Sequence, residues 1–85
     1  MSQTRLLFFG NLQDIAGHSE RIVELPADVH NGADLIKWIS GDNAPLRSAL
    51  SAPEVKLAVD HAITDKESEL SSPEEIAFLP PFSGG

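Results

Sequence analysis

The chain contains no cysteine, which excludes disulfides, thiolate metal sites and a cysteine nucleophile. It also has no apolar run near the roughly 18 residues that a membrane-spanning helix requires. Its first five residues, Met1 to Arg5, lack the pattern of a secretory signal. We therefore expect a cytoplasmic protein that uses neither a membrane nor a thiol.

Basic residues are scarce. The chain has six lysines and arginines and thirteen acidic residues, which give a formal net charge of −7. This balance repels a phosphate backbone and removes the electrostatic basis for binding nucleic acid. A protein with a basic surface is the expected partner, although an acidic surface that only keeps the protein soluble explains the same composition.

Residues arranged for catalysis are also lacking. The histidines, at positions 18, 30 and 61, are widely spaced, so we predict no metal site and no bound cofactor. Ser83 has no histidine and aspartate at a spacing that supports a catalytic triad. Neither a Walker pattern nor a Gly-x-Gly-x-x-Gly loop is present, so any activation by ATP must take place on a partner.

The 85 residues are enough for one small domain. Alternating apolar residues predict strands over Thr4–Gly10, Glu20–Leu25, Val55–Asp60 and Glu75–Leu79, with a short hairpin element over His61–Thr64. A helix is predicted over Gly32–Ser40, with Asn31 as its N-cap and Gly41 after its end. Asn11–Ser19 is predicted to be a loop, and Pro45–Leu50 one short helical turn.

The predicted order, β-β-α-β-β-β, is typical of the α+β, ubiquitin-like β-grasp fold: a mixed sheet with one main helix across one face. In this fold the first and last strands are parallel neighbours in the middle of the sheet. Phe9 and Leu79 would then lie close together on the face away from the helix, with Leu7, Ala77 and Ile63 nearby. An exposed apolar cluster of this kind indicates a partner-binding surface, unless loops of the same chain cover it.

The sequence ends in an unusual segment, Pro80-Pro81-Phe82-Ser83-Gly84-Gly85. The two prolines predict a stiff, extended start to a flexible tail over residues 80–85 of a single domain spanning 1–85. Fully extended, six residues reach about 20 Å. Gly84 and Gly85 have no β-carbon, so a narrow channel in another protein could admit this backbone and receive the Gly85 carboxylate. The alternative is a frayed end without a function.

The chain resembles the small subunit of molybdopterin synthase, a β-grasp sulfur carrier of molybdenum cofactor biosynthesis. The resemblance covers nearly the whole sequence and is most specific in the apolar last strand followed by Pro-Pro-x-Ser-Gly-Gly. It also includes Leu6-Leu7-Phe8-Phe9, Ala16-Gly17 and Leu57-Ala58-Val59. The chain departs from the common family pattern at Phe82, at Asp60 and in the turn Ser72-Pro73-Glu74.

The resemblance implies that an E1-like adenylyltransferase uses ATP to activate the Gly85 carboxylate, and that a sulfurtransferase system converts it to a thiocarboxylate. In a heterotetramer with the synthase large subunit, this group would donate sulfur to cyclic pyranopterin monophosphate, forming molybdopterin. The small subunit would not be catalytic alone. Two alternatives remain: a related sulfur carrier for thiamine synthesis or tRNA thiolation, and a ubiquitin-like modifier or interaction domain.

Overall fold

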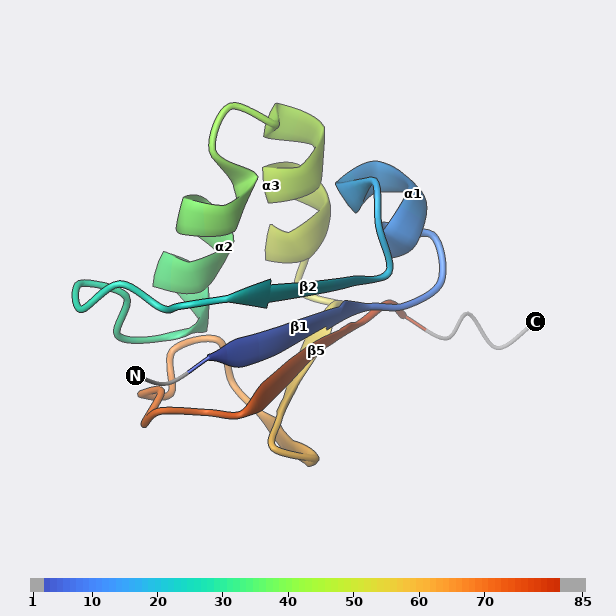
Figure 1. Ribbon diagram of the computed structural model, residues 1–85. Helices are drawn as coiled ribbons and strands as arrows, with labels where there is room; N and C mark the ends of the chain where they lie inside the picture. Colours follow the sequence, from blue (N-terminus) through green and yellow to red (C-terminus); the bar gives the residue numbers. More distant parts are fainter. Residues whose placement is uncertain (1–2, 82–85) are drawn as a thin grey trace.

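The computed structural model describes residues 3–81, which form a five-stranded mixed sheet with three helices on one of its faces (Figure 1). The elements are β1 (Thr4–Phe8), α1 (Leu12–Ala16), β2 (Glu20–Val23), α2 (Gly32–Ser40), α3 (Ala44–Ser51), β3 (Lys56–Val59), β4 (Ala62–Thr64) and β5 (Glu75–Leu79). None of the helices in this part of the chain has the length and apolar character needed to cross a membrane.

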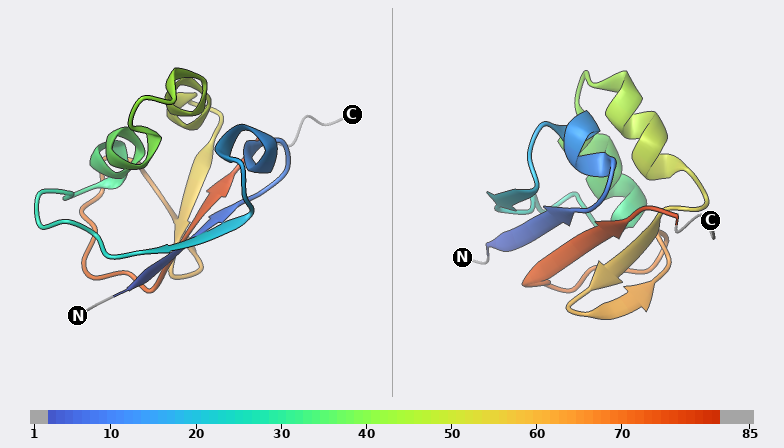
Figure 2. Two further views of the ribbon diagram at one scale, coloured as in Figure 1. Left: turned by 45° about the horizontal axis from the view of Figure 1, so that its top comes forward. Right: turned by 90° about the vertical axis from the view of Figure 1, so that its right-hand side faces the viewer.

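The strands are ordered β2-β1-β5-β3-β4 across the sheet. β1 and β5 pair in parallel, with Leu6 opposite Ile76 and Phe8 opposite Phe78, while the other neighbouring strands are antiparallel. The predicted parallel pairing of the first and last strands is therefore confirmed. This topology is the β-grasp fold, and it places the end of β5 beside the end of β1 (Figure 2).

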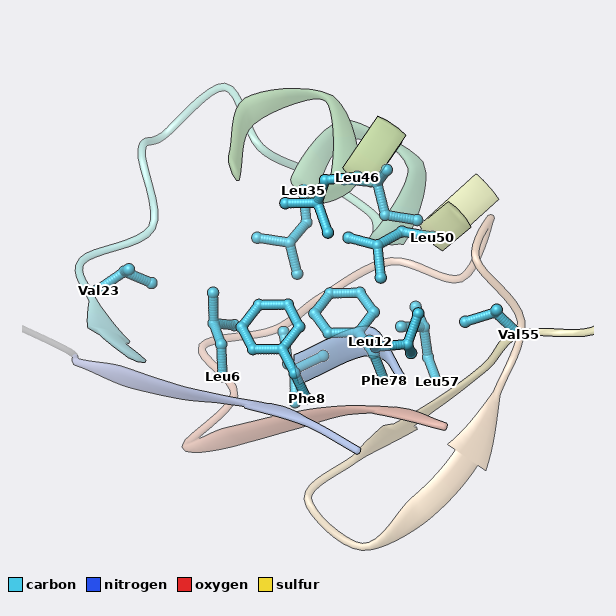
Figure 3. Packing of buried hydrophobic residues seen from close by; sticks show 12 residues of the cluster. Leu6, Phe8, Leu12, Val23, Leu35, Leu46, Leu50, Val55, Leu57 and Phe78 are labelled. Carbon is cyan, nitrogen blue, oxygen red and sulfur yellow. The ribbon is translucent and has the colours of Figure 1, made fainter. Parts of the chain in front are cut away.

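The core fills the space between the helices and the sheet (Figure 3). The strands contribute Leu6, Phe8, Leu57, Ile76 and Phe78, each at most 2% exposed. The rings of Phe8 and Phe78 stack with their centroids 5.2 Å apart and their planes 11° apart. Because alternate residues of a strand point to opposite faces, their intervening neighbours lie on the helix-free face.

The helices differ from the sequence prediction in number and length. α2 has the predicted bounds, and the Asn31 side chain accepts a hydrogen bond from the Asp34 N–H at 2.8 Å. The predicted loop over 11–19 was wrong, because Leu12–Ala16 forms α1 and buries Leu12. The single predicted turn is instead the eight-residue helix α3. The α2 helix is thus one of three that cover the sheet.

Three strands end earlier than predicted, and the first of them, β1, ends at Phe8 rather than at Gly10. β2 ends at Val23, and Leu25 is half-buried beyond it. β3 ends at Val59, because Asp60 and His61 have φ values of 49° and 74° and turn the chain into β4. Two residues at positive φ are typical of a tight hairpin turn. The Asp60 carboxylate also accepts hydrogen bonds from the Glu74 and Glu75 N–H groups at 2.9 and 3.0 Å.

Asp60 is expected to stabilise this turn and the start of β5. Asp60→Ala removes the acceptor of two hydrogen bonds. It also places at positive φ an alanine, whose side chain cannot form the local hydrogen bonds that help aspartate to adopt this conformation. We expect it to lower the free energy of unfolding by about 1–2 kcal/mol. Asp60→Asn keeps an acceptor oxygen and tolerates the conformation, so it should lose less. Urea unfolding curves in which both variants match the original chain would contradict this role.

Candidate functional site

The helix-free face of the sheet has a row of apolar side chains across four strands. The strand register sets Leu7 beside Ala77, Ala77 beside Ala58, and Ala58 beside Ile63. The middle of the row consists of alanines, which are short, and it is bounded by the larger Leu7 and Ile63. Within residues 3–81 all three helices lie on the opposite face (Figure 1), so no helix of this part covers the row.

Phe9 and Leu79 extend the row toward the end of the domain from which the tail leaves. The Phe9 N–H donates to the Phe78 carbonyl at 3.4 Å, so Phe9 continues the register of β1 and lies beside Leu79. Phe9 is 43% exposed, Ile63 is 64% exposed, and Leu79 is half-buried. We call Leu7, Phe9, Ile63, Ala77 and Leu79 the outer apolar face. The side-by-side placement of Phe9 and Leu79 agrees with the arrangement expected from the sequence.

The other end of the same sheet face is charged. Arg5 on β1 forms ion pairs with Glu20 at 3.3 Å and with Glu75 at 3.9 Å, and His61 approaches Glu75 at 3.5 Å. The Arg5 and Glu20 side chains are about half exposed to solvent. Exposed pairs of this kind add little to stability, and they distinguish this charged end of the face from the apolar end next to the tail.

The root of the tail packs against a glycine. Gly10 has a φ of 58°, and a β-carbon built there would lie 2.9 Å from Cγ of Pro80. Pro80 is half-buried and Pro81 is exposed. The sequence pattern placed Gly10 in a strand and did not reveal this contact, because the two residues are 70 positions apart in the chain. The only local signal was a glycine directly after Phe8-Phe9. The absence of a side chain at Gly10 therefore leaves room for the Pro80 ring at the start of the tail.

Replacing Gly10 should disturb both the turn and the tail. Gly10→Ala adds a side chain at positive φ and pushes on the Pro80 ring, so we expect a loss of about 1–2 kcal/mol in unfolding free energy. Gly17→Ala is a matched control, because Gly17 also has a positive φ, 89°, in the left-handed helical region, with nothing within 4 Å of its β-carbon position. If thermal melts show equal losses for the two variants, the Pro80 contact contributes nothing.

The other predicted site residues fall outside the described part of the chain. Phe82, Ser83, Gly84 and Gly85 belong to this group, so their predicted roles stay predictions. Among residues 3–81, His18 makes an edge-on contact with Phe8, and His61 lies beside Glu75. No three metal-ligating side chains come together in this range. Among residues 3–81, the outer apolar face and the contact of Gly10 with Pro80 are therefore the predicted site features that the structure describes.

A ubiquitin-like β-grasp domain with an apolar face beside its tail is the class of protein that these observations define. The model of the ThiS family matches residues 6–85, and the chain belongs to this family. A molybdopterin synthase sulfur carrier subunit of Dictyostelium discoideum is 25% identical over 84 residues, covering 99% of this chain and 98% of the relative. One of Chlamydomonas reinhardtii is 28% identical over 83 residues, covering 98% and 99%.

Solved structures share the fold. A putative molybdopterin converting factor subunit 1 from Pyrococcus furiosus superposes with a TM-score of 0.75 at 20% identity, covering 96% of this chain and all of that one. SAMP1 from Haloferax volcanii gives a TM-score of 0.77 at 19% identity, covering 98% and 99%. At these identities the likeness establishes the β-grasp fold.

Proposed function

We propose that this chain is the sulfur carrier subunit of a molybdopterin synthase. The observation that carries the proposal is the placement of the outer apolar face beside the root of the Pro80-Pro81 tail, whose sequence ends in Gly84-Gly85. The full-length relatives named above support it. In this role the domain docks on a partner while the tail delivers its terminal group to the partner's active site.

The chemistry begins at the Gly85 carboxylate, which is a poor acyl donor because its oxygen is a poor leaving group. An E1-like adenylyltransferase would join this oxygen to the α-phosphorus of ATP and release pyrophosphate. A sulfurtransferase system would then supply sulfur at the oxidation level of sulfide, which attacks the acyl carbon and displaces AMP, giving a thiocarboxylate. The chain has no cysteine thiol that could carry sulfur, so the proposed carrier group is the terminal carboxyl group of Gly85.

The synthase large subunit is the proposed acceptor of the loaded tail. It would bind cyclic pyranopterin monophosphate and provide the orientation and the acid and base groups that the small domain lacks. Two sulfur transfers complete the dithiolene of molybdopterin. The proposed assembly is a cytoplasmic heterotetramer of two small and two large subunits.

The intact mass of the protein, isolated from the organism that makes it, tests the carrier role. We expect a fraction whose mass exceeds that of the plain chain by the difference between one sulfur and one oxygen atom, and fragmentation should assign this difference to Gly85. Treatment with an alkylating reagent should shift only that fraction. A chain found only unmodified, or joined through Gly85 to lysines of other proteins, would contradict the proposal.

A further inference from the structure

Most of the few cations of this acidic chain gather in one region. Two cavities of about 300 Å³ each adjoin there and share Ser51, Lys66 and Glu67 in their walls. Lys56 lines the first cavity, and Lys37 and Arg47 line the second. With Lys66, these residues are four of the six lysines and arginines in the chain. We call the two cavities together the basic groove.

The groove is built where the segment after β4 crosses the ends of two helices. The Lys66 carbonyl accepts a hydrogen bond from the Ala33 N–H in the first turn of α2 at 3.0 Å. The Lys66 ammonium donates to the carbonyl of Ala52, directly after α3, at 2.6 Å. Lys66 therefore joins the start of α2 to the end of α3, and a cation there complements the negative end of the α3 dipole.

Within the part of the chain that the structure describes, none of the four cations of the groove forms an ion pair with a carboxylate within 4 Å. Among residues 3–81 the ion pairs involve Arg5 and His61, on the helix-free face of the sheet. Asp65 and Glu67 are the carboxylates in the lining, so the walls have two more positive than negative groups. Burial lowers the pKa of Lys66 and the charge of Lys56 adds to this effect, while the carboxylates of Glu67 and Glu54 oppose it. A protein of net charge −7 thus has one surface suited to an anion.

We propose that the basic groove binds an extended acidic segment of a partner protein. The cations are spread over two adjoining cavities, Lys56 in one and Lys37 with Arg47 in the other, with Lys66 shared. An extended peptide presents side chains on one side about 7 Å apart, so an acidic segment lying across both cavities would bring carboxylates to the cations of each. A compact phosphate would instead need several donors converging on one point.

This surface is separate from most of the outer apolar face. Lys37 and Arg47 lie on α2 and α3, which cover the opposite side of the sheet (Figure 2). Lys56 and Thr64 adjoin the outer apolar face, because Lys56 pairs with Leu79 across β3 and β5 and Thr64 follows Ile63 in β4. A partner could therefore engage the groove through Lys37 and Arg47 while another protein occupies the outer apolar face.

The test uses a capped hexaglutamate peptide and the isotope-labelled full chain at low salt, followed by NMR. We expect amide shifts confined to the basic groove, and binding that weakens steeply as salt is raised. The double variant Lys37→Gln/Arg47→Gln should bind the peptide about tenfold more weakly, and Lys56→Gln about threefold, since each exposed ion pair gives roughly a one- to fivefold factor. Arg21→Gln, on the far edge strand β2, is the control and should bind normally.

Three results would overturn the proposal. The first is a binding site elsewhere, seen either as peptide-induced changes of amide chemical shifts outside the groove or as equal peptide affinity of the double variant and the Arg21 control. Thermal melts must show that both variants are folded. The second is saturation of the groove by inorganic phosphate or ADP at concentrations where the peptide does not bind, which would make it a small-molecule site. The third is concentration-dependent shifts without peptide, which would make a second copy of this chain the occupant.

Discussion

Deleting Gly85, or adding one residue after it, is expected to abolish sulfur transfer while the domain remains folded. The proposed acyl donor is the Gly85 carboxylate. Deletion moves that group back by one residue, about 3.3 Å along an extended chain, and addition places a different residue at the end. Reacting groups must approach within about 3–3.5 Å, so such a shift removes transfer. Thiocarboxylate formation, measured by intact mass, and thermal melts should be recorded for both variants.

Ser83→Ala is the matched control for the two Gly85 variants. It changes a neighbouring residue but keeps the length of the tail and both glycines, so we expect it to form the thiocarboxylate and to transfer sulfur. Sulfur transfer by the deleted or the extended chain would mean that Gly85 is not the working group. Unfolding of either variant at a lower temperature would show that the tail contributes to the domain itself.

Leu79→Lys is expected to weaken the complex with the large subunit by about 2–4 kcal/mol, as loss of a buried apolar anchor at the centre of an interface does. Phe9→Lys should have a similar effect. In both variants a charge would be buried against an apolar partner surface without a counter-charge. Phe9 is already 43% exposed, so its substitution should leave folding nearly unchanged. Calorimetric titration with the large subunit measures the affinities.

Ile22→Lys provides the matched control for the outer apolar face. Ile22 is 58% exposed and lies beside Arg5, at the charged end of the sheet and away from the tail. We expect its substitution to leave the affinity within about threefold of the original. Unchanged affinity in both the Leu79 and the Phe9 variants, or an equal loss in the Ile22 variant, would place the interface elsewhere on the domain.

The strands and α2 could be predicted because their signals are local. Alternation in Leu6-Leu7-Phe8-Phe9 and Ile76-Ala77-Phe78-Leu79 gave the two faces of the central strands, and the structure confirms that Leu6, Phe8, Ile76 and Phe78 are in the core. Because side chains alternate strictly along a strand, the same pattern also identified the residues left on the helix-free face.

The short helices were harder to predict. α1 has only five residues, and the side chain of Asn11 forms no capping hydrogen bond, so its start resembles a turn. In α3, Pro45 was predicted to begin a single turn, and it does lie in the first turn, where its missing N–H leaves no hydrogen bond unmade, but the helix continues to Ser51. The Asn43 side chain accepts from the Leu46 N–H at 3.0 Å and supplies the cap.

Contacts between residues far apart in the sequence could not be predicted, because no local sequence pattern marks them. The packing of Pro80 on Gly10 and the hydrogen bond from Lys66 to Ala52 depend on the three-dimensional arrangement of β5, the segment after β4 and α3. Single residues of common types form both contacts, so spacing and composition do not reveal them. The basic groove was missed for the same reason, because its four cations lie far apart in the sequence.

Reconstitution of sulfur transfer tests the central claim most directly. The thiocarboxylated chain, a large subunit from the same source and cyclic pyranopterin monophosphate would be combined, and molybdopterin would be followed over time. The proposal predicts molybdopterin formation, with the chain returning to its plain carboxylate mass as sulfur leaves. Absence of molybdopterin, together with efficient sulfur donation to a thiazole synthase or a tRNA-thiolating enzyme, would contradict it and assign the carrier to another pathway.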